Sequence, residues 1–131
     1  MPLNRWILPG MLFAVLSLHG QELNSFSGRW EVHFNIFGKE GNQICVFSQQ
    51  GVDLKGSCVD SGAGDAVAGK VEGKTVTWRG IARYDGTRYT AEFRGTEDPS
   101  GRVVGTVTVV DAGVDGEFVA VKQEQDKLIN G

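Results

Sequence analysis

Histidine and cysteine are side chains widely used for catalysis and metal binding, and this chain has two of each. His33 lies between Val32 and Phe34 in an alternating segment, so its side chain is expected to point outward. A general base needs an orienting partner and a nucleophile within reach, and the sequence nominates neither. A metal site needs three or four ligands at recognisable spacing. His33 is the one histidine after residue 20, and with scattered carboxylates it does not provide that pattern. We therefore predict no enzymatic activity, no metal site and no cofactor.

The two cysteines, Cys45 and Cys58, lie symmetrically about a predicted turn near residues 50–52. This symmetry places them opposite each other on two antiparallel strands, where a disulfide is geometrically reasonable. Closing a loop of this size stabilises a fold by about 3 kcal/mol in the chain-entropy model. A metal pair and a catalytic thiol are the competing interpretations, but no C-x-x-C spacing favours either. We predict a structural disulfide.

Two arginines, Arg83 and Arg88, form a candidate anion contact. They are predicted to be cross-strand neighbours beside an Asp85-Gly86 turn, where like charges facing each other are mildly unfavourable. A bound anion would relieve this repulsion. In the alternative interpretation both side chains extend into water, with Asp85 close enough to help, because exposed charge pairs carry little energy.

A hairpin positions these arginines. Asp-Gly between two alternating runs is the strongest short-range hairpin signal, because a type I′ turn requires positive φ at both central residues. The two-residue turn at Asp85 and Gly86 sets Trp78 opposite Phe93 on one face of the hairpin.

From Gly28 onward the sequence consists of short alternating runs separated by glycine-rich turns, and no segment there has helical periodicity. The short connections predict that sequence neighbours pair in an antiparallel manner, which gives an all-β, up-and-down barrel of about eight strands. A β-sandwich is the alternative. The expected strands are residues 28–37, 43–49, 52–60, 66–72, 75–84, 88–96, 102–110 and 116–122.

Glycines recur on the predicted inner face, although glycine inside a strand costs roughly 0.5–1 kcal/mol relative to alanine. A type II′ turn at residues 72–75 places Gly69 opposite Trp78, and matching faces further along places Gly105 beside Phe93. Bare backbone would give the rings room and help the sheet to close. We predict that a side chain at either glycine is strongly destabilising.

The inner face also carries the candidate binding residues. Its aromatic rings could fill the interior as a packed core, or could surround one small ligand, since an eight-stranded barrel has room for little more than its own side chains. We predict a small, largely apolar ligand; the alternative is a protein- or surface-interaction module with a packed core. The predicted ligand-binding residues are Trp30, Phe34, Trp78, Tyr89, Phe93 and Phe118. The outward apolar residues for the alternative are Ile44, Val46, Val59, Ile81, Val104 and Val110.

The ends of the chain suggest its location. Residues 1–20 carry one basic residue and an apolar stretch of residues 6–18, which is typical of a cleaved signal peptide; a retained anchor is the alternative. Residues 21–122 form the barrel domain, and residues 123–131 are a polar tail. Removing residues 1–20 leaves 12 basic against 16 acidic residues, a net charge of −4. We expect a secreted or periplasmic monomer that neither binds nucleic acid nor spans a membrane.

A family resemblance rests on three short sequence motifs: Gly28-Arg29-Trp30 entering the first strand, the glycine-rich segment of residues 51–56, and Gly116-Glu117-Phe118 near the end. On these residues the chain resembles calycin-type barrels, the class of lipocalins and avidins. It is similar in more detail to uncharacterised small secreted bacterial β-barrel domains. The resemblance covers about residues 27–122 and implies a closed antiparallel barrel with a binding role.

Overall fold

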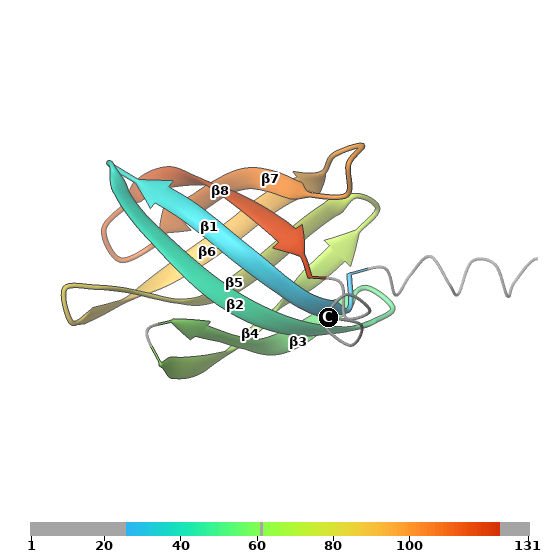
Figure 1. The fold of residues 1–131 in the computed structure, drawn as a ribbon, viewed down its shortest axis with the longest axis horizontal. Helices are drawn as coiled ribbons and strands as arrows, with labels where there is room; N and C mark the ends of the chain where they lie inside the picture. Colours follow the sequence, from blue (N-terminus) through green and yellow to red (C-terminus); the bar gives the residue numbers. More distant parts are fainter. Residues whose placement is uncertain (1–25, 61, 124–131) are drawn as a thin grey trace, which may run out of the picture.

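The computed structural model describes residues 26–60 and 62–123. Within these ranges, eight antiparallel strands form one closed barrel in which each strand pairs with its sequence neighbours (Figure 1). The predicted up-and-down barrel is therefore confirmed. The predicted signal peptide and residues 124–131 of the predicted tail lie outside the described residues. The strands are β1 (Gly28–Ile36), β2 (Lys39–Gln50), β3 (Asp53–Asp60), β4 (Ala63–Glu72), β5 (Thr75–Tyr84), β6 (Thr87–Glu97), β7 (Val103–Val109) and β8 (Val114–Lys122).

Pairing between the first and last strands closes the barrel. The β1–β8 ladder runs from Trp30 opposite Lys122 to Asn35 opposite Glu117. This pairing covers the edges of the first and last strands, which would otherwise be free to pair with other chains. Among the described residues, no helix is both long and apolar enough to cross a membrane.

The tight turns have the backbone that their residues predict. Asp85 and Gly86 both take positive φ, at 53° and 80°, as a type I′ turn requires. At residues 72–75 only Gly73 takes positive φ, at 64°, which is the pattern of type II′. The predicted pairs of Trp78 with Phe93 and of Gly69 with Trp78 follow from these turns and are confirmed.

Glycines face aromatic rings across several strand pairs, but one predicted partner is wrong. Gly105 lies opposite Gly95 on β6 and Phe118 on β8, whereas Phe93 lies opposite Val107. The β6–β7 loop at residues 98–102 sets this register, and its length carries no tight-turn signal. The aromatic–glycine pairs are Phe34–Gly41, Phe47–Gly56, Trp78–Gly69 and Phe118–Gly105.

Strand β2 is longer than predicted. It begins at Lys39 instead of Gln43, because Phe37 and Gly38 form a two-residue turn with φ of 54° and 77°. Phe37, predicted as the last residue of the first strand, is therefore at the tip of a hairpin.

Aromatic side chains close one end of the barrel. The ring of Phe26 stacks on Trp30 with centroids 4.3 Å apart, and Trp30 Nε1 donates a hydrogen bond to the Phe26 carbonyl at 3.0 Å. The Phe26 amide donates to Gln49 Oε1 at 3.0 Å, so the segment is held from two sides. We call the packed rings at this closed end and in the middle of the barrel the aromatic cluster: Phe26, Trp30, Phe47, Trp78, Phe93 and Phe118.

The loop from β6 to β7 also lies at this closed end. Asp98 accepts hydrogen bonds from the Ser100 hydroxyl at 2.7 Å and from the Arg102 amide at 3.1 Å. These bonds, that from the Ser100 side chain most of all, hold the pKa of the Asp98 carboxyl below its ordinary value.

The predicted disulfide joins β2 to β3. Cys45 and Cys58 are opposite each other in the ladder, and their sulfur atoms are bonded. We expect the double variant Cys45→Ala, Cys58→Ala to lose about 3 kcal/mol of unfolding free energy, because the unfolded chain gains loop entropy. Urea denaturation of the variant measures this loss. The oxidised wild type is the reference, and the wild type in reducing agent should match the variant; equal midpoints for variant and oxidised wild type would contradict the prediction.

Candidate functional site

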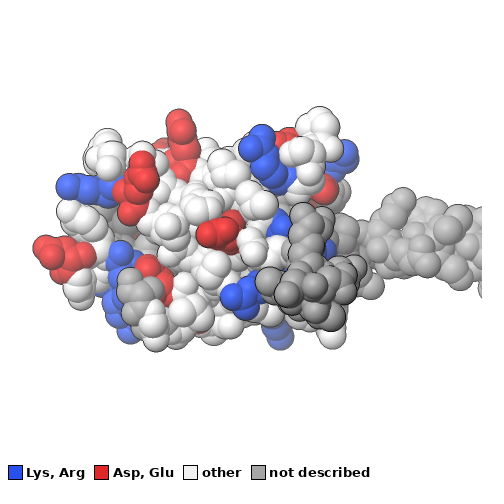
Figure 2. Space-filling view, viewed as in Figure 1, with Lys and Arg blue, Asp and Glu red and all other residues white. Residues whose placement is uncertain are grey.

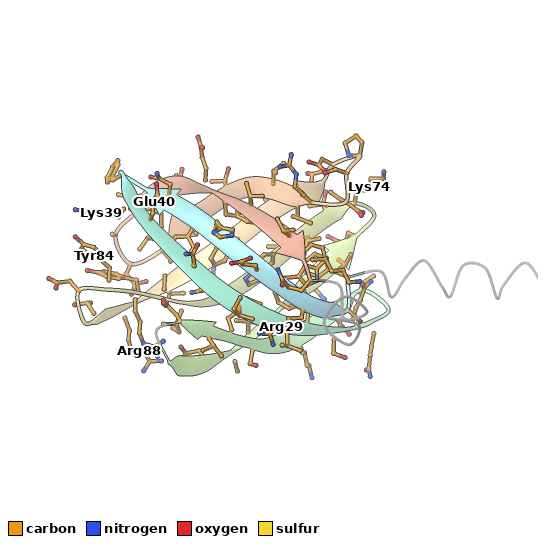
Figure 3. All side chains as sticks on the ribbon, in the orientation of Figure 1. Arg29, Lys39, Glu40, Lys74, Tyr84 and Arg88 are labelled. Carbon is orange, nitrogen blue, oxygen red and sulfur yellow. A yellow bond between two sulfur atoms is a disulfide. The ribbon has the colours of Figure 1, made fainter. Side chains whose placement is uncertain are left out.

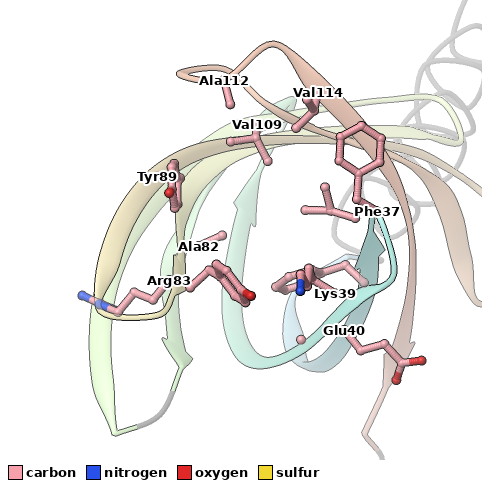
Figure 4. A pocket seen from close by; sticks show the side chains of 13 residues that line it. Phe37, Lys39, Glu40, Ala82, Arg83, Tyr89, Val109, Ala112 and Val114 are labelled. Carbon is pink, nitrogen blue, oxygen red and sulfur yellow. The ribbon is translucent and has the colours of Figure 1, made fainter.

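A pocket of about 330 Å³ opens at the end of the barrel away from the aromatic cluster. It lies between the β1–β2, β5–β6 and β7–β8 hairpins (Figure 4). Figure 3 places Tyr84 and Lys39 at this open end and Lys74 at the opposite, closed end. The wall is predominantly apolar and includes Phe34, Ile36, Ala82, Tyr89, Val109 and Val114.

Small inward residues and one buried amide surround the position of the pocket at the open end of the barrel. The inward positions Gly41 and Ala82 leave room beside larger neighbours, and a Cβ at Gly41 would meet the Phe34 ring. Below them Gln43, with 2% of its surface exposed, pairs with Val32 in the ladder. Its Nε2 donates to the Ile81 carbonyl at 2.8 Å, and so links β2 to β5 across the interior. Gln43 belongs neither to the pocket wall nor to the aromatic cluster.

Phe37 forms part of the rim and combines two unusual features. The residue is 79% exposed, and its φ of 54° lies in the left-handed region that bulky residues rarely adopt. A large apolar residue held in a strained conformation at the mouth of a pocket is a signal of function. The sequence analysis missed it; the signal was a bulky residue before Gly38 between two alternating runs.

One cation reaches over the mouth. Lys39 Nζ lies 5.3 Å from the centroid of the Tyr84 ring, within the range of a cation–π contact. Glu40, the next residue along β2, is directed away from the pocket (Figure 4). Lys39 therefore places a positive charge at the mouth of the apolar cavity.

The predicted arginine pair is present, and a carboxylate already lies between its members. Arg83 and Arg88 are opposite each other, as predicted. Asp65 on β4 contacts both: its Oδ2 lies 2.7 Å from Arg83 Nη1, and its Oδ1 lies 3.3 Å from Arg88 Nη2. This carboxylate offsets the repulsion that a bound anion was expected to relieve. The sequence analysis assigned no role to Asp65, because the fourth strand was predicted to begin at Ala66, whereas β4 begins at Ala63 and includes Asp65.

The predicted ligand-binding residues divide into two groups. Phe34 and Tyr89 line the pocket. Trp30, Trp78, Phe93 and Phe118 belong to the buried aromatic cluster and are absent from the pocket wall. Phe34 connects the groups, since its ring makes an edge contact with Phe93 at 6.0 Å between centroids. Direct contact of the four cluster residues with a ligand stays a prediction.

His33 is half-exposed on the outer surface, on the opposite side of β1 from the core residues Val32 and Phe34. Its Nε2 lies 3.5 Å from Glu31 Oε2. In the part of the chain that the structure describes, no group of three or more histidine, cysteine, aspartate or glutamate side chains could hold a metal ion.

The outward apolar residues of the alternative interpretation are spread over several strands. Ile44 and Ile81 are half-buried, whereas the four valines are exposed. On the face formed by β1, β2 and β8, uncharged surface surrounds a single acidic group in the middle, and most charges lie toward the ends (Figure 2). An interaction role for this surface stays a prediction. The four valines are Val46, Val59, Val104 and Val110.

No known protein family, curated protein or solved structure matches this chain. The closed barrel of eight antiparallel strands is shown by the structure. The resemblance to calycin-type barrels stays a prediction beyond that architecture.

Proposed function

We propose that this protein is a non-enzymatic, extracytoplasmic binding protein whose open-end pocket holds a small, largely apolar ligand. The observation that carries the proposal is the apolar pocket of about 330 Å³ in the mouth of the barrel. Barrel mouths are preferred places for small-molecule sites, which typically measure about 300–1,000 Å³. The volume suits a compact ligand that leaves one side toward solvent.

The fold divides its interior in a way that supports binding. The aromatic cluster fills the closed end and supplies most of the core packing that stabilises the barrel. The open end can therefore keep unfilled space without loss of the fold. The barrel wall therefore supplies a rigid support, while the three hairpin tips supply the contacts. Phe37 fits this division, because a solvent-exposed ring gains apolar contact only when something occupies the mouth.

The disulfide supports an extracytoplasmic location. Structural disulfides form and persist in oxidising compartments, and they are rare in the cytosol. The Cys45–Cys58 bond therefore agrees with the expected export of the chain.

Phe37→Asn tests the proposal by separating stability from binding. Asparagine tolerates positive φ, so we expect the variant to gain about 1 kcal/mol of unfolding free energy by relief of strain. The variant also lacks the apolar ring at the rim of the pocket, so we expect its dissociation constant for the neutral apolar dye Nile red to rise about tenfold. Thermal unfolding followed by circular dichroism and dye titration followed by fluorescence measure the two effects.

Val52→Asn is the matched control. Val52 is also an exposed apolar residue in a two-residue turn, but it lies at the closed end. Its replacement should leave dye affinity unchanged. The proposed function is contradicted if wild-type protein binds no Nile red, or if Phe37→Asn binds it as tightly as wild type.

A further inference from the structure

We infer that the end of the β5–β6 hairpin, residues 80–90, is a hinged flap that controls exchange of ligand with the open-end pocket, and that Asp65 is its latch. The gating role rests on the proposed binding function. The mobility of the flap does not, and it can be measured on the protein without ligand.

The barrel wall is interrupted on the β4 side of the flap. The β4–β5 ladder runs from Glu72 opposite Thr75 to Ala68 opposite Arg79 and ends there. Both strands continue, but residues 63–67 pair only with β3 and residues 80–84 pair only with β6. Val67 and Gly80 still touch, because a Cβ at Gly80 would lie 2.6 Å from Val67 Cγ1. The two hairpins therefore separate beyond this point, which is the natural hinge.

The wall also ends early on the β7 side. The β6–β7 ladder stops at Ala91 opposite Val109. One further backbone bond, from the Val110 amide to the Thr90 carbonyl at 2.9 Å, follows it. Thr90 also donates its amide to Asp111 Oδ1 at 3.1 Å. From Thr90 toward its tip at Asp85 and Gly86, the β5–β6 hairpin projects past its neighbours, as the left side of Figure 1 shows.

Side chains replace the missing ladder on the β4 side. Asp65 holds Arg83 and Arg88, and Gln43 holds the Ile81 carbonyl. The Asp65 and Arg83 side chains are only 15% and 23% exposed, so their ion pair is better shielded from solvent than that of Arg88, which is 61% exposed. A segment held by a few side-chain contacts opens at much lower free energy than a segment inside a continuous ladder.

Opening of the flap would move part of the pocket wall. Ala82, Tyr84 and Tyr89 of the flap line the pocket, and none of the β3 and β4 side chains that the structure describes does. Moving residues 80–90 away from β4 would therefore widen the pocket while leaving the aromatic cluster in place. Release of the latch should raise the rates of ligand binding and release together, while affinity changes little as long as the closed state still predominates.

Hydrogen exchange on the full chain without ligand tests the flap directly. In Asp65→Asn we expect exchange of the amides in residues 80–90 to accelerate about tenfold. Loss of both ion pairs frees the end of the hairpin from β4, and its own β5–β6 ladder, which no outer strand then supports, opens more often. Exchange in β1 and β8 should stay unchanged. Arg83→Gln removes only the shielded pair and should give the same pattern, so it replaces Asp65→Asn if that variant does not fold.

Asp53→Asn is the matched control. It breaks the exposed Asp53–Lys70 ion pair, which also joins neighbouring strands but lies far from the flap. It should leave exchange in residues 80–90 unchanged. The flap is overturned if exchange in residues 80–90 is unchanged in both Asp65→Asn and Arg83→Gln, or if exchange accelerates equally throughout the barrel.

Stopped-flow mixing with Nile red tests the gating role. We expect both the binding and the release rates to rise about tenfold in Asp65→Asn, matching the exchange result. A selective rise in exchange with unchanged dye kinetics overturns gating and leaves the pocket function intact. Absence of dye binding to wild-type protein contradicts both the proposed function and the gating role. The mobility of the flap is tested separately, by hydrogen exchange in residues 80–90.

Discussion

Gly69→Val is expected to destabilise the barrel by at least about 3 kcal/mol, a large part of the stability of a domain of this size. Gly69 lies opposite Trp78, and a Cβ there would collide with the Thr77 carbonyl oxygen and lie 2.6 Å from Trp78 Cα. The obstacle is backbone, which cannot rotate away as a side chain can. Relief would require β4 and β5 to separate where their ladder is intact. Urea denaturation measures the loss.

Gly64→Val on the same strand is the control for this prediction. A Cβ at Gly64 would make ordinary contacts, with Val59 Cγ2 at 3.7 Å and the Cys58 carbonyl at 4.0 Å. Valine is well suited to an exposed strand position, so this variant should keep stability within about 0.5 kcal/mol of wild type. Equal stabilities for the two variants would contradict the close approach of backbone at Gly69.

Ala82→Phe is expected to weaken Nile red binding at least about 100-fold, because a ring at this position occupies the ligand's space. Ala82 is buried, and it lies opposite Tyr89 on the pocket wall, where Figure 4 shows both side chains. The pocket has volume for the added ring, so the barrel should keep its near-ultraviolet circular dichroism. Fluorescence titration measures the loss of binding.

Two further variants complete the test of Ala82→Phe. Ala66→Phe adds the same ring at an exposed position of β4 that is outside the pocket wall, and it should bind the dye like wild type. Val109→Trp narrows the pocket from β7 and should also lose dye binding. This variant replaces Ala82→Phe in the test if Ala82→Phe does not fold. Wild-type affinity in folded Ala82→Phe would show that the dye binds elsewhere.

The tight turns account for most of what was predicted correctly. A turn with two central residues leaves only one register, because a shift of one residue would exchange the inner and outer faces of a strand. Asp85-Gly86 therefore predicted the partner of Trp78 and the pairing of Arg83 with Arg88, and the symmetry about residues 50–52 predicted the disulfide. Gly105 was misplaced because its register depends on a longer loop, whose geometry is decided by hydrogen bonds to Asp98.

The pocket was harder to predict than the barrel. Inward and outward positions follow from alternation, but the height of a residue along the barrel axis depends on every register and on the closure of β1 with β8. The sequence analysis therefore grouped Trp78 and Phe34 as candidate binding residues on one inner face. Both do face inward, but Phe34 lines the pocket, whereas Trp78 belongs to the aromatic cluster. Phe37 escaped notice for a related reason, since its turn became apparent only from its backbone angles.

The sequence alone determined the class of fold, the alternation of faces, the disulfide partners and the pairing of Gly69 with Trp78, because these depend on contacts between neighbouring strands joined by short turns. Tertiary structure alone decided which end is filled and which is open, where the β4–β5 ladder ends, and that Asp65 meets Arg83 and Arg88. These features join residues through the closed wall and across the interior. Their positions follow from the summed twist and registers of all eight strands, which no local pattern contains.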